Sequence, residues 1–220
     1  MVKHFLTEFF GDPNLGLFGF ATDKYCLLGS GLKNYDSVEE TLGVKVVKAK
    51  VLGTSLVGIF VTGNSKGVVV PSIVDEFEID ELKKHFDVLV LDTEYTALGN
   101  LILINDHGCI LSPLLKKHKE EIEEFFDVKC EVMKIAGLNV VGSVCIANNV
   151  GCLVHPNTTD EEGEKIKKIL KVKSINVGTA NFGSPFVGAC LIANSNGFIT
   201  SYHTTGPELA RIEEALFGQE

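Results

Sequence analysis

The sequence predicts an α/β fold in which five copies of one strand–strand–helix–strand unit surround a common axis. The first observation is a repeat that covers the whole chain of 220 residues. A glycine, an asparagine six residues later and a second glycine nine residues later recur, and the first glycines are 42, 41, 43 and 46 residues apart. Self-similarity at such a period is typical of repeat architectures. These first glycines, called anchor glycines below, are Gly16, Gly58, Gly99, Gly142 and Gly188.

The second observation is an Asn-x-x-Gly turn inside each copy, with a strand-like apolar run on either side. Asparagine and glycine both tolerate the left-handed backbone of tight turns, so we expect a hairpin in each copy. The first copy is degenerate and has Thr22 and Tyr25 in these two positions. The other four copies have the pairs Asn64 and Gly67, Asn105 and Gly108, Asn148 and Gly151, and Asn194 and Gly197.

The third observation is a helix pattern after each hairpin, followed in four copies by a closing strand. The clearest helix is expected at residues 113–126, where Leu114, Leu115, Ile122, Phe125 and Phe126 form one apolar stripe. Its start carries Ser112 as a cap and Pro113 in the first turn. Capping-box spacing predicts three further helix starts, at Ser37 with Glu40, Thr159 with Glu162 and Thr205 with Glu208. The closing strands are expected at residues 44–51, 87–94, 128–135 and 172–179.

The fifth copy lacks a closing strand, whereas the chain begins with a spare one, VKHFLTEFF at residues 2–10. An open array would leave a sheet edge exposed. We therefore expect this N-terminal strand to pair with the fifth unit, beside the strand that contains Leu191 and Ile192, and to close the ring. The predicted organisation is one domain over residues 1–220, with repeats at about 11–53, 54–94, 95–136, 137–180 and 181–220, the last completed by strand 1–10.

Composition argues against a nucleic-acid groove or a membrane protein. The net charge is −9, and Arg211 is the one arginine among 20 basic residues, whereas nucleic-acid affinity depends on Lys and Arg that neutralise phosphates. The uncharged stretches 135–159 and 174–207 contain Gly, Asn, Ser and Pro, which indicates strands and turns rather than bilayer spans. No signal peptide is evident at the N-terminus, so we expect a cytoplasmic protein whose six cysteines are reduced.

The cysteines and histidines give no pattern typical of catalysis or metal binding. Cys26, Cys109 and Cys152 each lie ten residues after an anchor glycine, where the other copies have Val68 and Phe198. A position filled by these residue types is a buried strand position, in which cysteine acts as a small apolar residue. Cys152 and His155 have the spacing of a metal-ligand pair, but no second pair completes a site. We expect no catalytic residue, no metal and no cofactor.

Several motifs carry a resemblance to a known family. The segments ALGN at 97–100, CILSP at 109–113, GCLVHPNTTDEE at 151–162 and NVGTANFGSPFVGA at 176–189, placed within five such units, closely resemble the translation initiation factor 6 family in its archaeal form. The resemblance covers essentially the whole chain. It implies a pseudo-fivefold α/β propeller of the pentein type, with no enzymatic activity.

The resemblance also implies a function and a partner. It implies a factor that binds the large (50S) ribosomal subunit and prevents its association with the small subunit, with a role in large-subunit biogenesis. The implied partner is a ribosomal protein of the L-fourteen family near the sarcin–ricin loop. Little direct RNA contact, no membrane contact and a monomeric state are expected.

Two other functions remain open at this point. The same architecture hosts enzymes that attack guanidino substrates with a cysteine nucleophile, and the chain contains cysteines. It could also serve as a scaffold for other partners. A reactive low-pKa thiol would favour the enzyme, whereas co-sedimentation with ribosomal subunits would distinguish the translation factor from the scaffold.

The candidate binding residues come from positions that break the repeat. Scaffold positions recur in a repeat protein, whereas positions that differ between copies are free to specialise. A mixed apolar and polar set without basic residues suits a protein contact, and we expect Ile59 and Asn100 to contribute most; the alternative is that these residues merely line a water-filled channel. The residues directly after the anchor glycines are Leu17, Ile59, Asn100, Ser143 and Ala189, and Phe186 is expected nearby.

Overall fold

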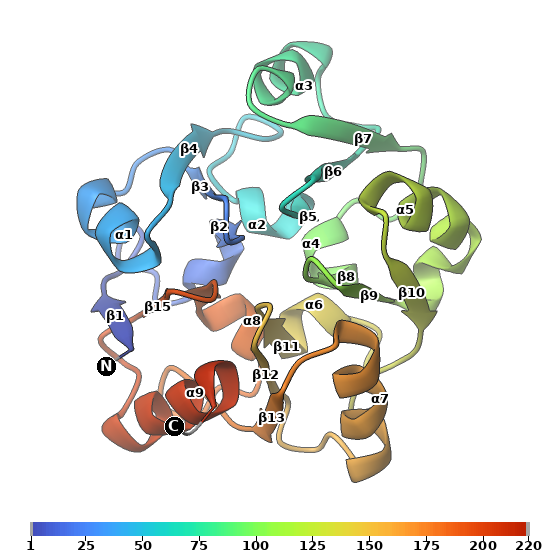
Figure 1. The fold of residues 1–220 in the computed structure, drawn as a ribbon. Coiled ribbons are helices and arrows are strands. Elements are labelled where there is room, and N and C mark those ends of the chain that lie inside the picture. Colours follow the sequence, from blue (N-terminus) through green and yellow to red (C-terminus); the bar gives the residue numbers. More distant parts are fainter. Residues whose placement is uncertain (1, 219–220) are drawn as a thin grey trace.

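The structure is a computed structural model that describes residues 2–218. Five three-stranded sheets stand around a common axis, and one helical layer lies outside them (Figure 1). In each sheet the middle strand pairs antiparallel with the first strand and parallel with the third. The fold is therefore α/β with five similar units, as the repeat predicts.

The strands of each unit follow the expected order. The first strands, nearest the axis, are β2 (Gly19–Ala21), β5 (Thr62–Asn64), β8 (Ile102–Ile104), β11 (Cys145–Ala147) and β14 (Ile192–Ala193). The middle strands are β3 (Tyr25–Gly29), β6 (Gly67–Pro71), β9 (Gly108–Leu111), β12 (Gly151–Val154) and β15 (Gly197–Thr200). The third strands are β4 (Lys45–Ala49), β7 (Asp87–Leu91), β10 (Lys129–Val132), β13 (Ser174–Val177) and, for the fifth sheet, β1 (Lys3–Leu6).

The N-terminal strand belongs to the fifth sheet, but its neighbour there differs from the expectation. β1 pairs parallel with β15, in the register Lys3 with Gly197 to Leu6 with Thr200. The strand that contains Ile192 is β14, and it lies on the other side of β15. The expectation that residues 2–9 lie beside the strand with Leu191 and Ile192 is wrong, because the third strand of every unit pairs with the middle strand and not with the first.

In the first four units helices connect the middle strand to the third, and in the fifth unit α9 follows the middle strand β15. Two of these helices clearly cover the sheet of the preceding unit: α7 packs on β9 and β10, and α9 packs on β12 and β13. The outer helices are α1 (Tyr35–Leu42), α3 (Glu76–Lys83), the 3-10 helix η2 (Pro113–His118) with α5 (Lys119–Phe126), α7 (Asp160–Leu170) and α9 (Gly206–Phe217). Shorter helical turns precede the first strands and are η1 (Leu15–Leu17), α2 (Val57–Phe60), α4 (Leu98–Leu101), α6 (Val141–Val144) and α8 (Val187–Cys190).

Two of the three predicted capping boxes are present. Thr159 with Glu162 caps α7 and Thr205 with Glu208 caps α9. Ser112 also caps its helix by accepting a hydrogen bond from the backbone N–H of Leu114, although the first six residues of that predicted helix are 3-10 helix.

The predicted capping box at Ser37 is wrong. Ser37 lies inside α1, which begins at Tyr35. The Tyr35 hydroxyl fixes the entry to this helix instead, because it accepts a hydrogen bond from the N–H of Gly31 at 2.9 Å and donates one to the carbonyl of Gly29 at 2.8 Å. A contact with the loop before the helix has replaced the capping box in this unit.

The apolar core consists of five clusters, each shared by two neighbouring units. Five clusters of buried residues each combine strand residues with one face of a helix. In the predicted helix at 113–126, Leu115, Ile122 and Phe126 are buried, and Leu114 and Phe125 pack against the same cluster. Within residues 2–218, the helices are all too short or too polar to span a bilayer.

Candidate functional site: the two ends of the axis

The five anchor glycines lie in the short helical turns at one end of the axis, which we call the glycine end. Each occupies the second position of its helical turn. Each turn packs against the next, from α2 through α4, α6 and α8 to η1 and back to α2. A side-chain carbon on any of these glycines would overlap the carbonyl oxygen of the neighbouring unit's anchor glycine. Glycine is therefore required for the turns to approach one another.

This requirement predicts opposite effects for two glycine-to-alanine changes. Gly99→Ala should lower the free energy of unfolding by about 1–3 kcal/mol, because the added methyl meets the backbone of Gly58. Gly163→Ala, within α7, should raise it by roughly 0.5–1 kcal/mol, because alanine favours the helix and the methyl meets only Ile175 at 4.0 Å. Denaturant unfolding of the two variants measures both values, and equal shifts would contradict the role given to the anchor glycines.

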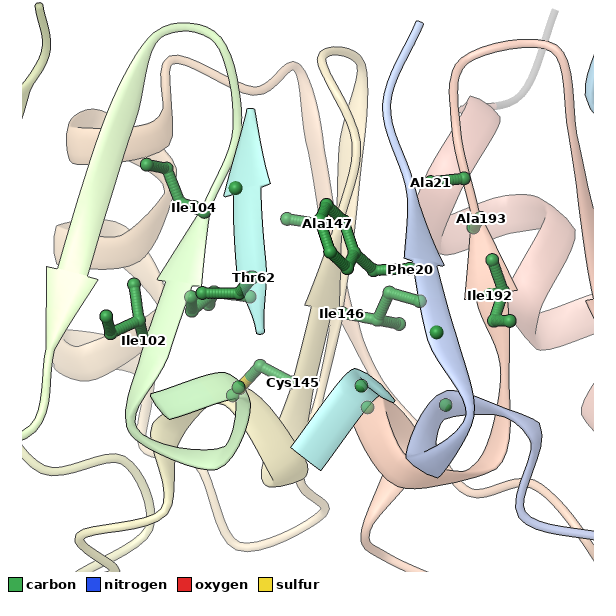
Figure 2. A pocket seen from close by; sticks show the side chains of 18 of the residues that line it. Phe20, Ala21, Thr62, Ile102, Ile104, Cys145, Ile146, Ala147, Ile192 and Ala193 are labelled. Atoms are coloured by element: carbon green, nitrogen blue, oxygen red, sulfur yellow. The ribbon is translucent and has the colours of Figure 1, made fainter. Parts of the chain in front are cut away.

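A small cavity lies on the axis above the glycine end. Its volume is about 80 Å³, and the five anchor glycines and the first strands line it. Figure 2 shows the side chains of Phe20, Thr62 and Ile146 between these strands. A space of this size can hold a few water molecules but no nucleotide or other large cofactor.

The residues that follow the anchor glycines lie together in these helical turns and are half-buried. Equivalent backbone bonds hold them, such as Ile59 N–H to the Leu56 carbonyl at 3.2 Å and Asn100 N–H to the Ala97 carbonyl at 3.0 Å. Phe186 is the residue directly before α8 and is 43% exposed. The structure thus places all six predicted binding residues at the glycine end, namely Leu17, Ile59, Asn100, Ser143, Phe186 and Ala189. Their role in binding stays a prediction.

The turn asparagines form a second ring, at the opposite end of the axis. Each buried Nδ2 donates to the backbone of the next unit, as Asn105 does to the Asn148 and Leu170 carbonyls, both at 2.9 Å. The ring continues through Asn148 and Asn194, and Asn194 donates to the Thr22 and Leu42 carbonyls of the first unit. These side chains connect each hairpin both to the next hairpin and to the end of the next helix.

In the degenerate first copy Thr22 replaces the asparagine, and Tyr25, at the position of the turn glycine, supplies the donor to the next unit. Its hydroxyl donates to the carbonyls of Asn64 and Gly67, at 2.8 and 3.1 Å. Burial, with a smaller contribution from Asp106, raises the pKa of this hydroxyl far above its ordinary value. The group therefore remains a donor. The sequence marks Tyr25 as an exception to the repeat, but its contact with the second unit was not predicted.

The expected reason for the Asn-x-x-Gly turn is wrong. Neither the asparagines nor the turn glycines have a positive φ. The asparagine is needed instead because its Oδ1 accepts backbone N–H groups inside the turn, as Asn148 does from Val150 and Gly151 at 2.8 Å. The glycine is needed because a side chain at Gly151 would overlap the Ala215 carbonyl of the next unit.

A further polar layer covers the asparagine end. Asn149 donates from Nδ2 to Asp23 and to Asp106, each at 2.7 Å, so one amide connects units one, three and four. Ser195 donates to Asp23, and Ser65 donates to Asp106, each through backbone and side chain. These residues directly follow the turn asparagine position, and sequence reasoning missed them although the shared position was visible.

The thiols lack the properties of nucleophiles. All six cysteines are buried, as predicted for core positions. Burial raises the pKa of Cys26 to about 12 and those of Cys109 and Cys152 well above the ordinary value. His155 is buried, and burial lowers its pKa. Among residues 2–218, no group of three or more His, Cys, Asp and Glu side chains could hold a metal ion.

Five similar α/β units around a small axial cavity, with all six thiols buried, define the class, which is a repeat-built α/β protein. A model of the eIF-6 family matches residues 5–215. Translation initiation factor 6 of Pyrococcus horikoshii is 43% identical over 219 residues, covering 95% of this chain and 96% of that protein. Translation initiation factor 6 of Methanocaldococcus jannaschii is 42% identical over 217 residues, with 94% and 95% covered. That of Staphylothermus marinus is 36% identical over 217 residues, with 95% of each covered.

The chain belongs to the eIF-6 family. The resemblance drawn from the sequence motifs is confirmed, and so is the expectation that the protein is a translation factor and not an enzyme. The guanidino-enzyme alternative is set aside on the same findings.

Proposed function

We propose that the protein binds the large (50S) ribosomal subunit through the glycine end of its axis and thereby prevents association with the small subunit. Family membership supports the choice of process. The observation that carries the choice of surface is the set of six side chains at that end, which differ between units while the surrounding positions recur. A large-subunit factor with this surface also has the means to act during subunit biogenesis, before the small subunit joins.

The proposed partner is a basic ribosomal protein, of the L-fourteen family near the sarcin–ricin loop. The support is chemical. The chain has a net charge of −9, and the six candidate residues include apolar and neutral polar side chains but no lysine or arginine. Such a set suits the centre of a protein–protein contact better than a phosphate backbone. Direct RNA contact is accordingly small, and the protein acts in the cytoplasm as a monomer.

We further propose that the chain is one domain of five repeats, which form a pentein propeller closed by the N-terminal strand. The pairing of β1 with β15 supports closure. The contact between the anchor glycines of the fifth and first units, Gly188 and Gly16, supports it independently. A closed ring gives the binding face a fixed shape, because all five helical turns then have two neighbours.

Charge substitutions at the glycine end test the proposal. Ile59→Lys and Asn100→Lys should each weaken binding to purified large subunits at least tenfold, about 1.4 kcal/mol, because a lysine meets the basic partner. Phe77→Lys is the matched control, since Phe77 is 74% exposed on α3, away from the axis. Co-sedimentation with separated subunits measures binding, and thermal melting checks folding. If both variants bind and block subunit joining like the parent, the binding face lies elsewhere.

A further inference from the structure

Four exposed aromatic side chains lie on loops of the fifth unit and of its junctions with the first and fourth units. We call Phe10, Phe182, Phe186 and Tyr202 the seam aromatics. Phe182 is 83% exposed, Phe10 75% and Tyr202 66%. The turn with Phe10 leads into η1 and the turn with Phe182 leads into α8, so both adjoin the helical turns of the glycine end. The seam aromatics therefore extend the glycine end to one side.

Side-chain bonds join the segments that carry these residues. Asn181 Nδ2 donates to the Pro13 carbonyl at 2.8 Å, which connects the Phe182 turn to the segment after Phe10. His203 Nε2 lies 3.3 Å from Glu8 Oε1, which connects the Tyr202 loop to the segment before Phe10. The segments that carry Phe10, Phe182 and Tyr202 are thus tied to one another rather than independent loops.

Two of the seam aromatics have a backbone conformation that does not suit them. Phe10 has φ 56° and Phe182 has φ 61°, in the left-handed region that bulky residues rarely adopt. Leu52 has a similar φ of 53° in the corresponding turn of another unit, but it packs against a core cluster. Phe10 and Phe182 remain largely exposed, so burial in the fold does not offset the strain. Strained residues of this kind are concentrated at functional sites.

The strained turn with Phe182 is also firmly held. The Glu208 carboxylate accepts the backbone N–H groups of Phe182 and Gly183, at 3.3 and 2.8 Å. Asn181 Oδ1 accepts the hydroxyls of Ser201 and Thr204, at 2.8 and 3.0 Å. The ring is therefore presented on a fixed backbone, which reduces the entropy lost when a partner binds.

The charges near the seam aromatics indicate the kind of partner. The segments 8–14, 181–186 and 201–205 contain Glu8 and Asp12 but no lysine or arginine. A phosphate backbone would be repelled there, whereas a protein with an apolar recess and basic rim would be attracted. We propose that the seam aromatics are the anchor of the protein contact, so that the partner sits off-centre, over the first and fifth units. This inference rests on the proposed function of the glycine end.

Asparagine substitutions test the inference, because they relieve the strain while they remove the rings. Asparagine accepts a positive φ, and at position 10 it gives the Asn-Gly pair that type I′ turns favour. The double variant Phe10→Asn, Phe182→Asn should melt at the same temperature as the parent or higher. It should bind purified large subunits at least tenfold more weakly. Phe77→Asn, which removes an equally exposed ring on α3, should leave binding unchanged.

Each of the other possible outcomes would contradict a specific part of the proposal. If the parent itself does not bind large subunits, the proposed function fails and the inference fails with it. If the parent binds and the double variant binds equally well, only the inference fails. A melting temperature lower by several degrees would show that the rings stabilise the fold. If the parent binds protein-free ribosomal RNA and the double variant does not, the seam aromatics contact RNA bases and not a protein. The single variant Phe182→Asn provides the same readouts if the double variant does not fold.

Discussion

A chain that lacks residues 1–10 is expected to lose its cooperative fold. The truncation removes β1, exposes the edge of β15, and deletes Phe9, which is fully buried. Phe9 stacks on Phe18 with 4.0 Å between ring centroids, and Phe5 packs against the same cluster. Loss of side chains of this size costs roughly 4–10 kcal/mol in total, which is comparable with the whole stability of a domain. A soluble truncated chain that melts cooperatively would contradict the proposed closure of the ring by the N-terminal strand.

Adjacent phenylalanines provide the control for this truncation. Phe9→Ala should lower the free energy of unfolding by about 3–5 kcal/mol, because the ring is buried and leaves a cavity. Phe10→Ala should change it by less than about 0.5 kcal/mol, because that ring is 75% exposed. Thermal or denaturant unfolding of the two full-length variants separates the loss of core packing from any effect of shortening the chain.

The order of strands and helices could be predicted because the same signals recur in every unit. One Asn-x-x-Gly turn is weak evidence for a hairpin, whereas four at a nearly constant period fix the repeat and its five copies. The spare strand at residues 2–10 could be assigned to the fifth unit for the same reason. Its neighbour in the sheet could not be assigned as easily, because the choice between β14 and β15 depends on which strand is central, and periodicity does not determine that.

The contacts between units could not be predicted from the sequence. The backbone preferences of asparagine and glycine suggested left-handed turns, but both residues are needed for contacts with the next unit. Tyr25 and Asn149 likewise form hydrogen bonds with groups 39 or more residues away in the chain. Glu208 accepts a hydrogen bond from the backbone of the neighbouring turn at Gly183. Local patterns describe the inside of a unit, and only the assembled structure shows which groups face each other across the axis.

The candidate binding residues also show what the repeat can and cannot reveal. Leu17, Ile59, Asn100, Ser143 and Ala189 could be selected because they differ at one fixed position of the repeat. Phe182 could not be selected in this way, since its turn in the fifth unit is longer by one residue than the turn at Ile135 to Leu138. Its exposure and its positive φ, on which the further inference depends, are visible only in the structure.

The asparagine ring gives the second large prediction. Asn105→Ala should lower the free energy of unfolding by at least about 3 kcal/mol, because unsatisfied buried polar groups cost roughly 1–3 kcal/mol each. The change leaves the carbonyls of Asn148 and Leu170 without their donor, and the N–H groups of His107 and Gly108 without their acceptor. Denaturant unfolding of the variant measures this loss.

The expected loss of stability differs between the asparagines of the ring. Asn64 has longer bonds, 3.5 Å to the Asn105 carbonyl and 3.4 Å to the Phe126 carbonyl, and its Oδ1 accepts from the Lys66 N–H alone. Asn64→Ala should therefore cost about half as much as Asn105→Ala, since bonds of that length are weak. Equal losses for the two variants, or a loss below about 1 kcal/mol for Asn105→Ala, would contradict the structural role of the ring. The packing of the anchor glycines at the opposite end would then be what holds the five units together around the axis.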